Sequence, residues 1–309
     1  ISGVVAFMLH DFGFRGVSSV ESSGLGGSSH IINFMGTDTV SAILFAQEFY
    51  NTENPLAFSI PASEHSTITS WGEPFEVKAM ENMLDSYPTG LVACVSDSFD
   101  IIRACRDYWG TALRDKILSR DGRLVIRPDS GDPVQTLKQI FHILWNKFGG
   151  TNNDKGFKVL DPHVRVIQGD GVNFESILDI CDMMIEEGFS IENIAFGMGG
   201  ALLQKVDRDT QKFAIKCSSI VINGEEIEVQ KNPIEINEKG ERVQSFKKSK
   251  AGRLKLIYDG VNYKTIQRCK DFSDDILIPI FENGKILKEW TFEEVRERAE
   301  VKINVEELV

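Results

Sequence analysis

The segment Ser59-Ile-Pro-Ala-Ser-Glu-His-Ser-Thr-Ile-Thr-Ser-Trp-Gly72 shows how this chain is built. An apolar run from Ala57 to Ile60 ends at Pro61 and gives way to small and polar residues around His65. This profile is typical of a buried strand that delivers a histidine to the rim of a parallel sheet or barrel. A lone histidine is a weak signal, because histidine is often only a partly exposed structural residue. Whether His65 has a functional role must therefore be judged from the residues at the other strand ends.

Apolar runs alternate with longer amphipathic stretches through the first two thirds of the chain. The runs predict strands near 4–9, 30–35, 57–61, 90–95, 123–127, 164–168 and 192–196. The amphipathic stretches predict helices near 38–50, 74–86, 98–118, 133–148 and 173–188, and Asp132 before Pro133 is a typical helix start. Only the Gly/Ser-rich link over 16–29 fits neither pattern. The alternation predicts an α/β domain over residues 1–210, with a parallel sheet covered on its faces.

The pattern of alternating apolar runs and amphipathic stretches ends at about residue 205. Asn223-Gly224, Asp259-Gly260 and Asn283-Gly284 each stand between β-prone runs, which is the strongest short-range signal for a β-hairpin. Residues 237–250 are polar and basic, and we expect a long loop there. A last helix begins after Thr291, where Glu294 completes a capping box. We therefore expect a β-rich portion with a carboxy-terminal helix over residues 211–309.

Composition excludes several classes of protein. The chain has 309 residues, 42% of them hydrophobic, and a formal net charge of −12, which argues against a nucleic-acid binder because that function needs a basic face. The five cysteines are widely spaced without a C-x-x-C pair, so we expect reduced thiols in a cytoplasmic protein and no zinc site. No apolar run is long enough to span a membrane. The apolar start at Ile1, without methionine, predicts that the chain is one part of a larger protein.

Seven apolar runs end in glycine, aspartate, serine or a residue type common in catalysis. These ends read His10-Asp-Phe-Gly13, Gly36-Thr-Asp38, Ser63-Glu-His65, Ser96-Asp-Ser98, Arg127-Pro-Asp-Ser-Gly-Asp132, Gln168-Gly-Asp-Gly171 and Gly197-Met-Gly-Gly200. In parallel sheets and α/β barrels, sites form where the carboxyl ends of strands meet. Turn formation and helix capping explain any single one of these ends equally well. Seven in succession favour one shared site.

Two of these ends suggest a phosphorylated ligand. Glycines at 197, 199 and 200 allow backbone N–H groups to approach a phosphate before the helix-like segment that follows. In Arg127-Pro-Asp129 the proline fixes the arginine, which can bind oxygens bidentately, relative to an aspartate that can accept from sugar hydroxyls. Asp38, Asp97 and Asp170 could hold Mg²⁺ through water beside a polyphosphate. The residues alone predict an enzyme that acts on a phosphorylated sugar or nucleotide.

Taken in order, these motifs resemble the nicotinamide phosphoribosyltransferases, which are type II phosphoribosyltransferases. The resemblance runs along the whole chain and rests on Leu9-His-Asp-Phe-Gly-Phe-Arg-Gly-Val-Ser-Ser19, Gly36-Thr-Asp-Thr39, Pro61-Ala-Ser-Glu-His-Ser-Thr67, Val95-Ser-Asp-Ser98, Ile126-Arg-Pro-Asp-Ser-Gly131, Val166-Ile-Gln-Gly-Asp-Gly171 and Ile194-Ala-Phe-Gly-Met-Gly-Gly200. It implies a (β/α) barrel-like phosphoribosyltransferase domain followed by part of an antiparallel β-sheet domain. The implied reaction transfers phosphoribose from phosphoribosyl pyrophosphate to nicotinamide, giving nicotinamide mononucleotide and pyrophosphate in NAD salvage.

The resemblance assigns residues to the pyridine and ribose. Phe12 matches the aromatic residue that stacks on the ring, and Asp38 matches the carboxylate that accepts from the carboxamide NH₂. A carboxylate there disfavours nicotinate, which carries its own negative charge. Arg127 matches a ligand of the carboxamide oxygen and pyrophosphate, and Asp129 a ligand of ribose hydroxyls. The positions implied to line the ribose and phosphate are Gly169, Asp170, Gly199 and Gly200.

The resemblance also assigns residues to the phosphates. Arg15 and His65 would face the pyrophosphate, and His65 would be phosphorylated by ATP, adding charge beside the transferred group. Catalytic roles are implied for His65, Asp97, Arg127 and Asp129. No direct metal ligand is assigned, because Mg²⁺ would be held through phosphates and water. The residues implied to reach the partner's site across a homodimer interface are Arg208, Lys216 and Lys247.

The chain departs from the family pattern in two ways. It lacks an amino-terminal portion that contributes to the sheet domain and to ring binding, and a separate chain could supply it. Ala93, Met198 and Ala214 stand where animal members have serines. Two alternatives therefore stay open: a nicotinate-using relative, against which Asp38 argues, and an inactive half that binds phosphates until it pairs with an amino-terminal chain.

Overall fold

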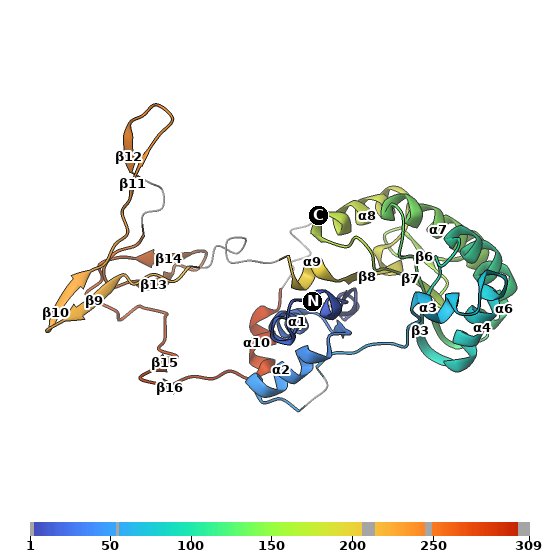
Figure 1. Ribbon diagram of the computed structural model, residues 1–309, viewed down its shortest axis with the longest axis horizontal. Helices are drawn as coiled ribbons and strands as arrows, with labels where there is room; N and C mark the ends of the chain where they lie inside the picture. The colour runs from blue at the N-terminus through green and yellow to red at the C-terminus, as the bar shows by residue number, and fades with distance from the viewer. Residues whose placement is uncertain (1–2, 54–55, 206–213, 245–248, 302–309) are drawn as a thin grey trace. The chain divides into compact units, whose positions relative to one another are not determined.

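The computed structural model describes residues 3–53, 56–205, 214–244 and 249–301. The chain divides into two units, Ile1–Val206 with Trp290–Val309, and Asp207–Glu289 (Figure 1). Each unit is described by itself.

Six parallel strands form the centre of the first unit. In spatial order they are β2 (Gly36–Thr37), β1 (Leu9–Asp11), β8 (Ile194–Met198), β7 (Val164–Gln168), β4 (Asp121–Arg127) and β3 (Thr89–Val95). All five pairings in this sheet are parallel, which confirms the predicted α/β class.

The segment that contains Phe58 and Ala62 closes this sheet into a barrel. Phe58 forms a parallel bridge with Gly36 on β2, and Ala62 forms one with Ala93 on β3. The amide N–H of Phe58 donates to the Met35 carbonyl at 2.7 Å, and that of Ala93 donates to the Pro61 carbonyl at 2.8 Å. The segment predicted as a strand over 57–61 is therefore irregular. It joins the two edges of the sheet through isolated bridges and leads directly to His65.

Alternate residues of the strands point into the barrel or out to the helices, as the two-residue period of a strand requires. The interior holds a small cluster: Phe12, Ile60, Ala93, Val125, Ile167 and Ala195. The outward residues join the main core, where Leu124 and Ile126 of β4 are fully buried.

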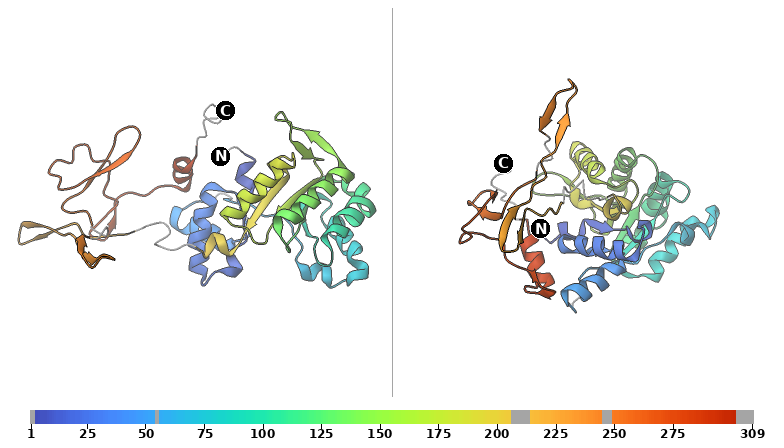
Figure 2. Two further views of the ribbon diagram at one scale, coloured as in Figure 1. Left: turned by 90° about the horizontal axis from the view of Figure 1, so that it is seen from above. Right: turned by 60° about the vertical axis from the view of Figure 1, so that its left-hand side comes forward.

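Helices cover the outside of the barrel, as Figure 2 shows. They are α1 (Val20–Asn33), α2 (Val40–Tyr50), α3 (His65–Thr69), α4 (Glu76–Ser86), α5 (Ile101–Arg103), the π-helix η4 (Ala104–Ala112), α6 (Arg114–Leu118), α7 (Pro133–Phe148), α8 (Phe174–Glu186) and α9 (Gly200–Leu203). Short 3₁₀ turns are η1 (Val5–Phe7), η2 (Phe14–Gly16), η3 (Glu73–Phe75) and η5 (Ile191–Asn193), and β5 (Gly150–Asn152) pairs antiparallel with β6 (Lys158–Leu160). The predicted helix start at Pro133 is confirmed, because Asp132 accepts from the Gln135 amide at 2.8 Å. Among the described residues, none of the helices is both long and apolar enough to cross a membrane.

Two sequence-based predictions are wrong at the amino-terminal end. Within the strand predicted over 4–9, Val5–Phe7 form the turn η1 and the strand begins only at Leu9. Residues 30–33 end helix α1 instead of forming a strand. Part of the Gly/Ser-rich link is the body of α1. It is helical because its small residues let α2 approach closely, and Ser23 hydrogen-bonds Ser41 across the contact at 2.6 Å. A Cβ atom on Gly27 would lie 2.7 Å from the Cβ of Ala42.

The second unit consists of antiparallel hairpins. The hairpins predicted at the three Xaa-Gly turns are confirmed: β9 (Ser219–Ile222) with β10 (Glu225–Glu228), β13 (Lys255–Tyr258) with β14 (Tyr263–Ile266), and β15 (Phe281–Glu282) with β16 (Lys285–Ile286). Asn223 has a φ of 52° and Gly224 one of 87°, the left-handed pair that a tight hairpin turn needs. The loop expected over 237–250 is partly wrong, because β12 (Arg242–Gln244) pairs with β11 (Ile234–Ile236).

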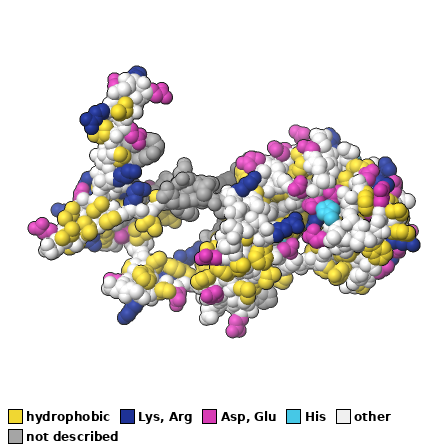
Figure 3. Space-filling view, viewed as in Figure 1, with side chains coloured by type: hydrophobic (Ala, Val, Ile, Leu, Met, Phe, Trp, Pro, Cys, Tyr) yellow, Lys and Arg dark blue, Asp and Glu magenta, His cyan; other side chains and the backbone are white. Residues whose placement is uncertain are grey.

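Apolar side chains of this second unit lie largely on its surface. In the described part of the unit, Ala251 is the one buried hydrophobic residue, whereas Val221, Ile236 and Tyr263 are at least 65% exposed. Figure 3 shows hydrophobic side chains spread over the region of β9, β10, β13 and β14. Two-stranded ribbons of this kind gain little stability by themselves.

The predicted carboxy-terminal helix is present as α10 (Phe292–Ala299), and its capping box between Thr291 and Glu294 is confirmed. Its assignment to the β-rich portion is wrong. Phe292 is fully buried in a cluster with Ile31 and Leu56 of the first unit. Arg296 donates to the carbonyls of these same two residues, which fixes the helix there.

Glu76 is a fully buried carboxylate at the start of α4. Neither of its oxygens has a hydrogen-bond partner among the described residues. The nearest cation is Arg103, whose guanidinium nitrogen lies 3.7 Å away. Burial raises the pKa of Glu76 to about 7, against the opposing charge of Arg103.

The contact between α1 and α2 gives a first prediction. Gly27→Val should lower the free energy of unfolding by about 1–3 kcal/mol, because the new side chain overlaps Ala42 and Thr39. Urea unfolding measures the change, with Ser29→Val on the exposed face of the same helix as the control. Equal unfolding midpoints for the two variants would contradict this packing.

The buried carboxylate gives a second prediction. Because the folded state holds the Glu76 proton more tightly than the unfolded chain, stability is lost as pH rises from about 4.5 through 7. Glu76→Gln cannot ionise, so its advantage in unfolding free energy over wild type should grow by about 2 kcal/mol between pH 5 and pH 8.5. The control is Glu81→Gln, which removes another carboxylate of α4, one that pairs with Lys116 of α6. A pH-independent difference for Glu76→Gln would disprove the assignment.

Candidate active site

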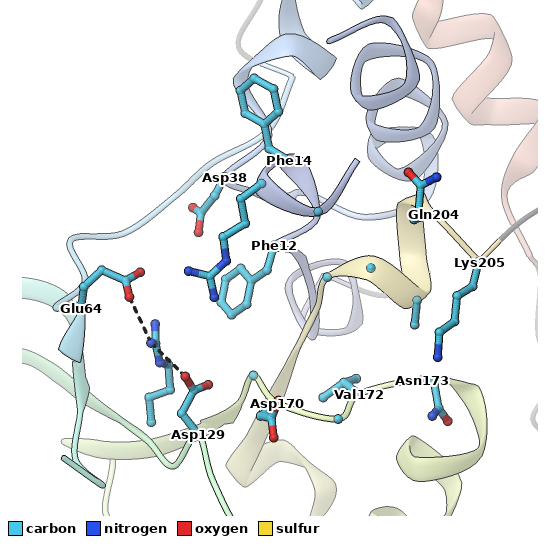
Figure 4. Close-up of a pocket in the computed structure, with 18 residues that line it drawn as sticks. Phe12, Phe14, Asp38, Glu64, Asp129, Asp170, Val172, Asn173, Gln204 and Lys205 are labelled. Carbon is cyan, nitrogen blue, oxygen red and sulfur yellow. Dashed lines mark hydrogen bonds and ion pairs between the residues drawn. The ribbon is translucent and has the colours of Figure 1, made fainter. Parts of the chain in front are cut away.

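A cavity of about 890 Å³ opens at the carboxyl ends of the parallel strands. This volume is in the range of small-molecule sites. Nine of the residues predicted from the sequence line it: Phe12, Arg15, Asp38, Arg127, Asp129, Gly169, Asp170, Gly199 and Gly200. They come from five different strand ends, so the barrel brings together residues that lie far apart in the sequence (Figure 4).

The ring of Phe12 is seated against glycine. A Cβ atom on Gly197 would lie 2.0 Å from the Cε2 of Phe12, and one on Gly169 would lie 3.2 Å from the same atom. No side chain larger than hydrogen fits at Gly197 unless Phe12 moves. The glycines of β8 and of the loop after β7 therefore fix where this aromatic ring stands in the cavity.

Arg127 occupies the centre of an ionic cluster at the end of β4. Its guanidinium nitrogen lies 3.4 Å from Asp129 Oδ2 and 3.6 Å from Glu64 Oε2, and its side chain is only 9% exposed. Burial raises the pKa of Asp129, although the charge of Arg127 opposes this rise. A largely buried arginine between two carboxylates is a preorganised site for an anionic ligand that can replace one of them.

His65 stands beside this cluster at the start of α3 and is not in the cavity lining. Its Nε2 lies 3.1 Å from Asp97 Oδ1, and its Nδ1 lies 3.9 Å from Asp129 Oδ2. Asp97 is almost fully buried, and its other oxygen accepts from the Asp129 amide at 3.1 Å and the Ser130 hydroxyl at 2.5 Å. The histidine is therefore oriented by a carboxylate that is itself held in place.

Asp38 lies across the cavity from this cluster, at the end of β2. His10 Nε2 lies 3.0 Å from Asp38 Oδ1, and the Ser59 hydroxyl also donates to that oxygen. Burial disfavours the charged form, but these hydrogen bonds and the charges of His10 and Arg127 outweigh it and hold the pKa of Asp38 below its usual value. The carboxylate facing the cavity is therefore ionised at neutral pH.

Sequence reasoning missed several lining residues: Phe14, Glu64, Asn173, Gln204 and Lys205. Glu64 directly precedes His65, and Asn173 follows the Gly-Asp-Gly end of β7, so their places beside strand ends were the available signal. Lys205 and Asn173 lie at one end of the cavity, away from Asp38 and Glu64 (Figure 4). Lys205 adds a cation to the lining, which also includes the glycines that follow β8.

The roles predicted for the three cationic positions at an interface are not tested by the described residues. Arg208 and Lys247 lie outside the described part of the chain. Lys216 is exposed and belongs to the second unit. Among described residues, no group of three or more histidine, cysteine, aspartate or glutamate side chains could hold a metal ion directly.

Comparison with known proteins places the chain in a family. Residues 7–270 match the model of the nicotinate phosphoribosyltransferase (NAPRTase) family. The chain is 51% identical over 308 residues to a nicotinamide phosphoribosyltransferase of Xanthomonas campestris pv. campestris, covering 96% of this chain and 64% of that protein. It is 32% identical over 311 residues to one of Acinetobacter baylyi, covering 94% and 60%. Over 241 residues it is 32% identical to one of Mycoplasma pneumoniae, covering 74% and 51%.

The chain thus spans at most 64% of the length of these curated relatives. The family match covers most of the parallel barrel, all the cavity-lining residues and much of the hairpin unit. With the parallel barrel and the strand-end cavity, this match leads to one conclusion: the chain belongs to the nicotinate phosphoribosyltransferase family.

Proposed function

We propose that this chain acts as a nicotinamide phosphoribosyltransferase of NAD salvage. It would transfer phosphoribose from phosphoribosyl pyrophosphate to nicotinamide, releasing pyrophosphate. The observation that carries the proposal is the content of one cavity: the Phe12 ring, the Asp38 carboxylate, the Arg127–Asp129 pair and the glycine loops after β7 and β8. The names of the two relatives from Xanthomonas campestris and Acinetobacter baylyi support the same substrate.

The lining supports a division of roles. Phe12 would stack on the pyridine ring while Asp38 accepts from the carboxamide NH₂. Asp129 and Asp170 would receive the ribose, and backbone N–H groups around Gly199 and Gly200 would hold its phosphate. Arg15 and Arg127 would bind the pyrophosphate. Its oxygens would replace the Glu64 carboxylate as a partner of Arg127.

The chemical step needs no general base. Pyrophosphate leaves with the electrons of its bond to the anomeric carbon, an oxocarbenium-like state develops, and the pyridine nitrogen captures it with its lone pair. That nitrogen carries no proton in nicotinamide. The protein's task is to position the two substrates and to stabilise the charge on the leaving oxygen.

Mg²⁺ fits this lining when bound through substrate phosphates and water. Asp129 and Asp170 both line the cavity and can accept from metal-bound water. The ion would neutralise charge on the departing pyrophosphate.

We propose that ATP phosphorylates His65 in support of this transfer. The His65 side chain is partly exposed, and its Nε2 contacts the buried carboxylate of Asp97. Both features support phosphorylation of a ring that is held in one orientation. The family-assigned contacts of Arg208, Lys216 and Lys247 belong to a homodimer with shared sites, which we also propose. A cytoplasmic location agrees with five free cysteines.

The exposed apolar faces of the hairpin unit support a further element of the functional protein. We propose that additional β structure, in the same or a separate chain, covers them. If turnover requires the part of the relatives' length that this chain does not span, this chain by itself would bind the substrates without converting them.

The substrate assignment is tested with nicotinamide and nicotinate supplied together with phosphoribosyl pyrophosphate and Mg²⁺. Mass spectrometry should detect nicotinamide mononucleotide as the main product. Asp38→Ser should lower the ratio of amide to acid product about tenfold or more, because it removes the acceptor and the repelling charge. Preference for nicotinate in wild type would establish the alternative enzyme, and substrate binding without any product would favour the inactive half.

The role of His65 is tested by the effect of ATP on the same transfer. His65→Ala should abolish ATP stimulation and leave some basal product, because the nucleophile is lost while the cavity lining stays. His163→Ala is the matched control, since His163 pairs with Asp161 at 2.7 Å at the opposite end of β7. ATP stimulation that survives in His65→Ala would refute the phosphorylation site.

A further inference from the structure

His10 and Ser59 lie beside Asp38 and have no assigned role. His10 is the middle residue of β1, and its ring stands 5.1 Å from that of Phe12, measured between centroids. A Cβ atom on Gly36 would lie 2.7 Å from His10 Nδ1, so the ring leans over this glycine of β2. In this position the ring directs its Nε2 atom toward Asp38.

Both donors reach the same carboxylate oxygen. Asp38 Oδ1 accepts from His10 Nε2 at 3.0 Å and from the Ser59 hydroxyl, while among the described residues none hydrogen-bonds Oδ2. An ionised carboxylate has only acceptors, so the His10 nitrogen that faces it carries the proton. The backbone is fixed as well, because the Asp38 amide donates to the Asp11 carbonyl at 2.9 Å.

The carboxylate therefore cannot rotate freely in the cavity. Asp38 lines the cavity and its side chain is 47% exposed, whereas the His10 side chain is 13% exposed behind it. Because Oδ1 already accepts two hydrogen bonds, Oδ2 is the oxygen that is available to a ligand. A fixed acceptor can accept from an amide N–H, and it leaves a carboxylate ligand without a donor.

We propose that His10 and Ser59 are positioning residues that fix Asp38 with Oδ2 toward the cavity and thereby set its preference for a ring carboxamide over a ring carboxylate. The inference rests on the proposed function, since it concerns how that site selects its pyridine. Neither residue needs to touch the substrate. They act by keeping one oxygen occupied and the carboxylate charged.

The first measurement is the ratio of kcat/KM for nicotinamide to that for nicotinate. His10→Phe keeps an aromatic ring but removes the donor, and should lower the ratio about tenfold, in line with the loss of a hydrogen bond to a charged group. Ser59→Ala, at an exposed position outside the barrel interior, should lower it in the same direction. His10→Gln restores a donor and should recover part of the ratio, and KM for phosphoribosyl pyrophosphate should stay unchanged throughout.

The matched control is His142→Phe. His142 also pairs with a carboxylate, Glu187 at 2.8 Å, but at the helical surface of the barrel. A second readout, the NMR titration of the Asp38 carboxyl carbon, should move to higher pH in His10→Phe and return toward wild type in His10→Gln.

The outcomes separate this inference from the proposed function. A wild-type ratio that is unchanged in both His10→Phe and Ser59→Ala overturns the inference alone. If wild type makes no nucleotide, the proposed turnover fails, and the same ratio is taken from the binding of the two pyridines followed by NMR. If wild type binds neither pyridine, both proposals fall.

Discussion

The barrel depends on a few backbone hydrogen bonds that close it between β2 and β3. Phe58 pairs with the β2 side and Ala62 with the β3 side, so one short segment satisfies two sheet edges that would otherwise be open. Closure has a geometric consequence. Parallel strands in a closed ring all end at the same rim, so the residues that follow them face one cavity. The segment that closes the ring is also the one that ends at His65.

The rim is organised so that charged groups hold one another. Asp97 is fixed by backbone and hydroxyl donors and orients His65, while Asp129 and Glu64 hold Arg127. Asp38 is fixed in the same manner by His10 and Ser59. Such a site pays its ordering cost during folding, so less is lost when a substrate binds. The glycines next to Phe12 also preorganise the site, because the absence of side chains at these positions determines where the ring can lie.

The two units differ in how they bury apolar surface. The barrel packs large side chains such as Trp109 and Phe141 between its sheet and its helices, where both are fully buried. The hairpins expose most of theirs. Phe292 shows that the sequence order of elements does not decide which core a residue joins, since α10 follows the hairpins in the chain and packs on α1 and α2. Burial of Phe292 and the hydrogen bonds of Arg296 together hold this helix in the first unit.

The sequence by itself determined the parallel α/β class, most strands and helices, the hairpin turns and nine of the cavity-lining residues. The fold features follow from local signals: apolar runs of strand length, helix caps, and Asn-Gly or Asp-Gly turns. The lining residues were predicted from the polar residues and glycines that follow strands, together with the resemblance to a known family. Helix α1 was missed because glycine and serine are poor helix formers in isolation, and the helix exists through its close contact with α2. Tertiary structure alone decided the closure of the barrel, the seat of Phe12 on Gly197 and the pairing of His10 with Asp38, because each joins atoms that are distant in sequence and meet only when the sheet curls into a ring.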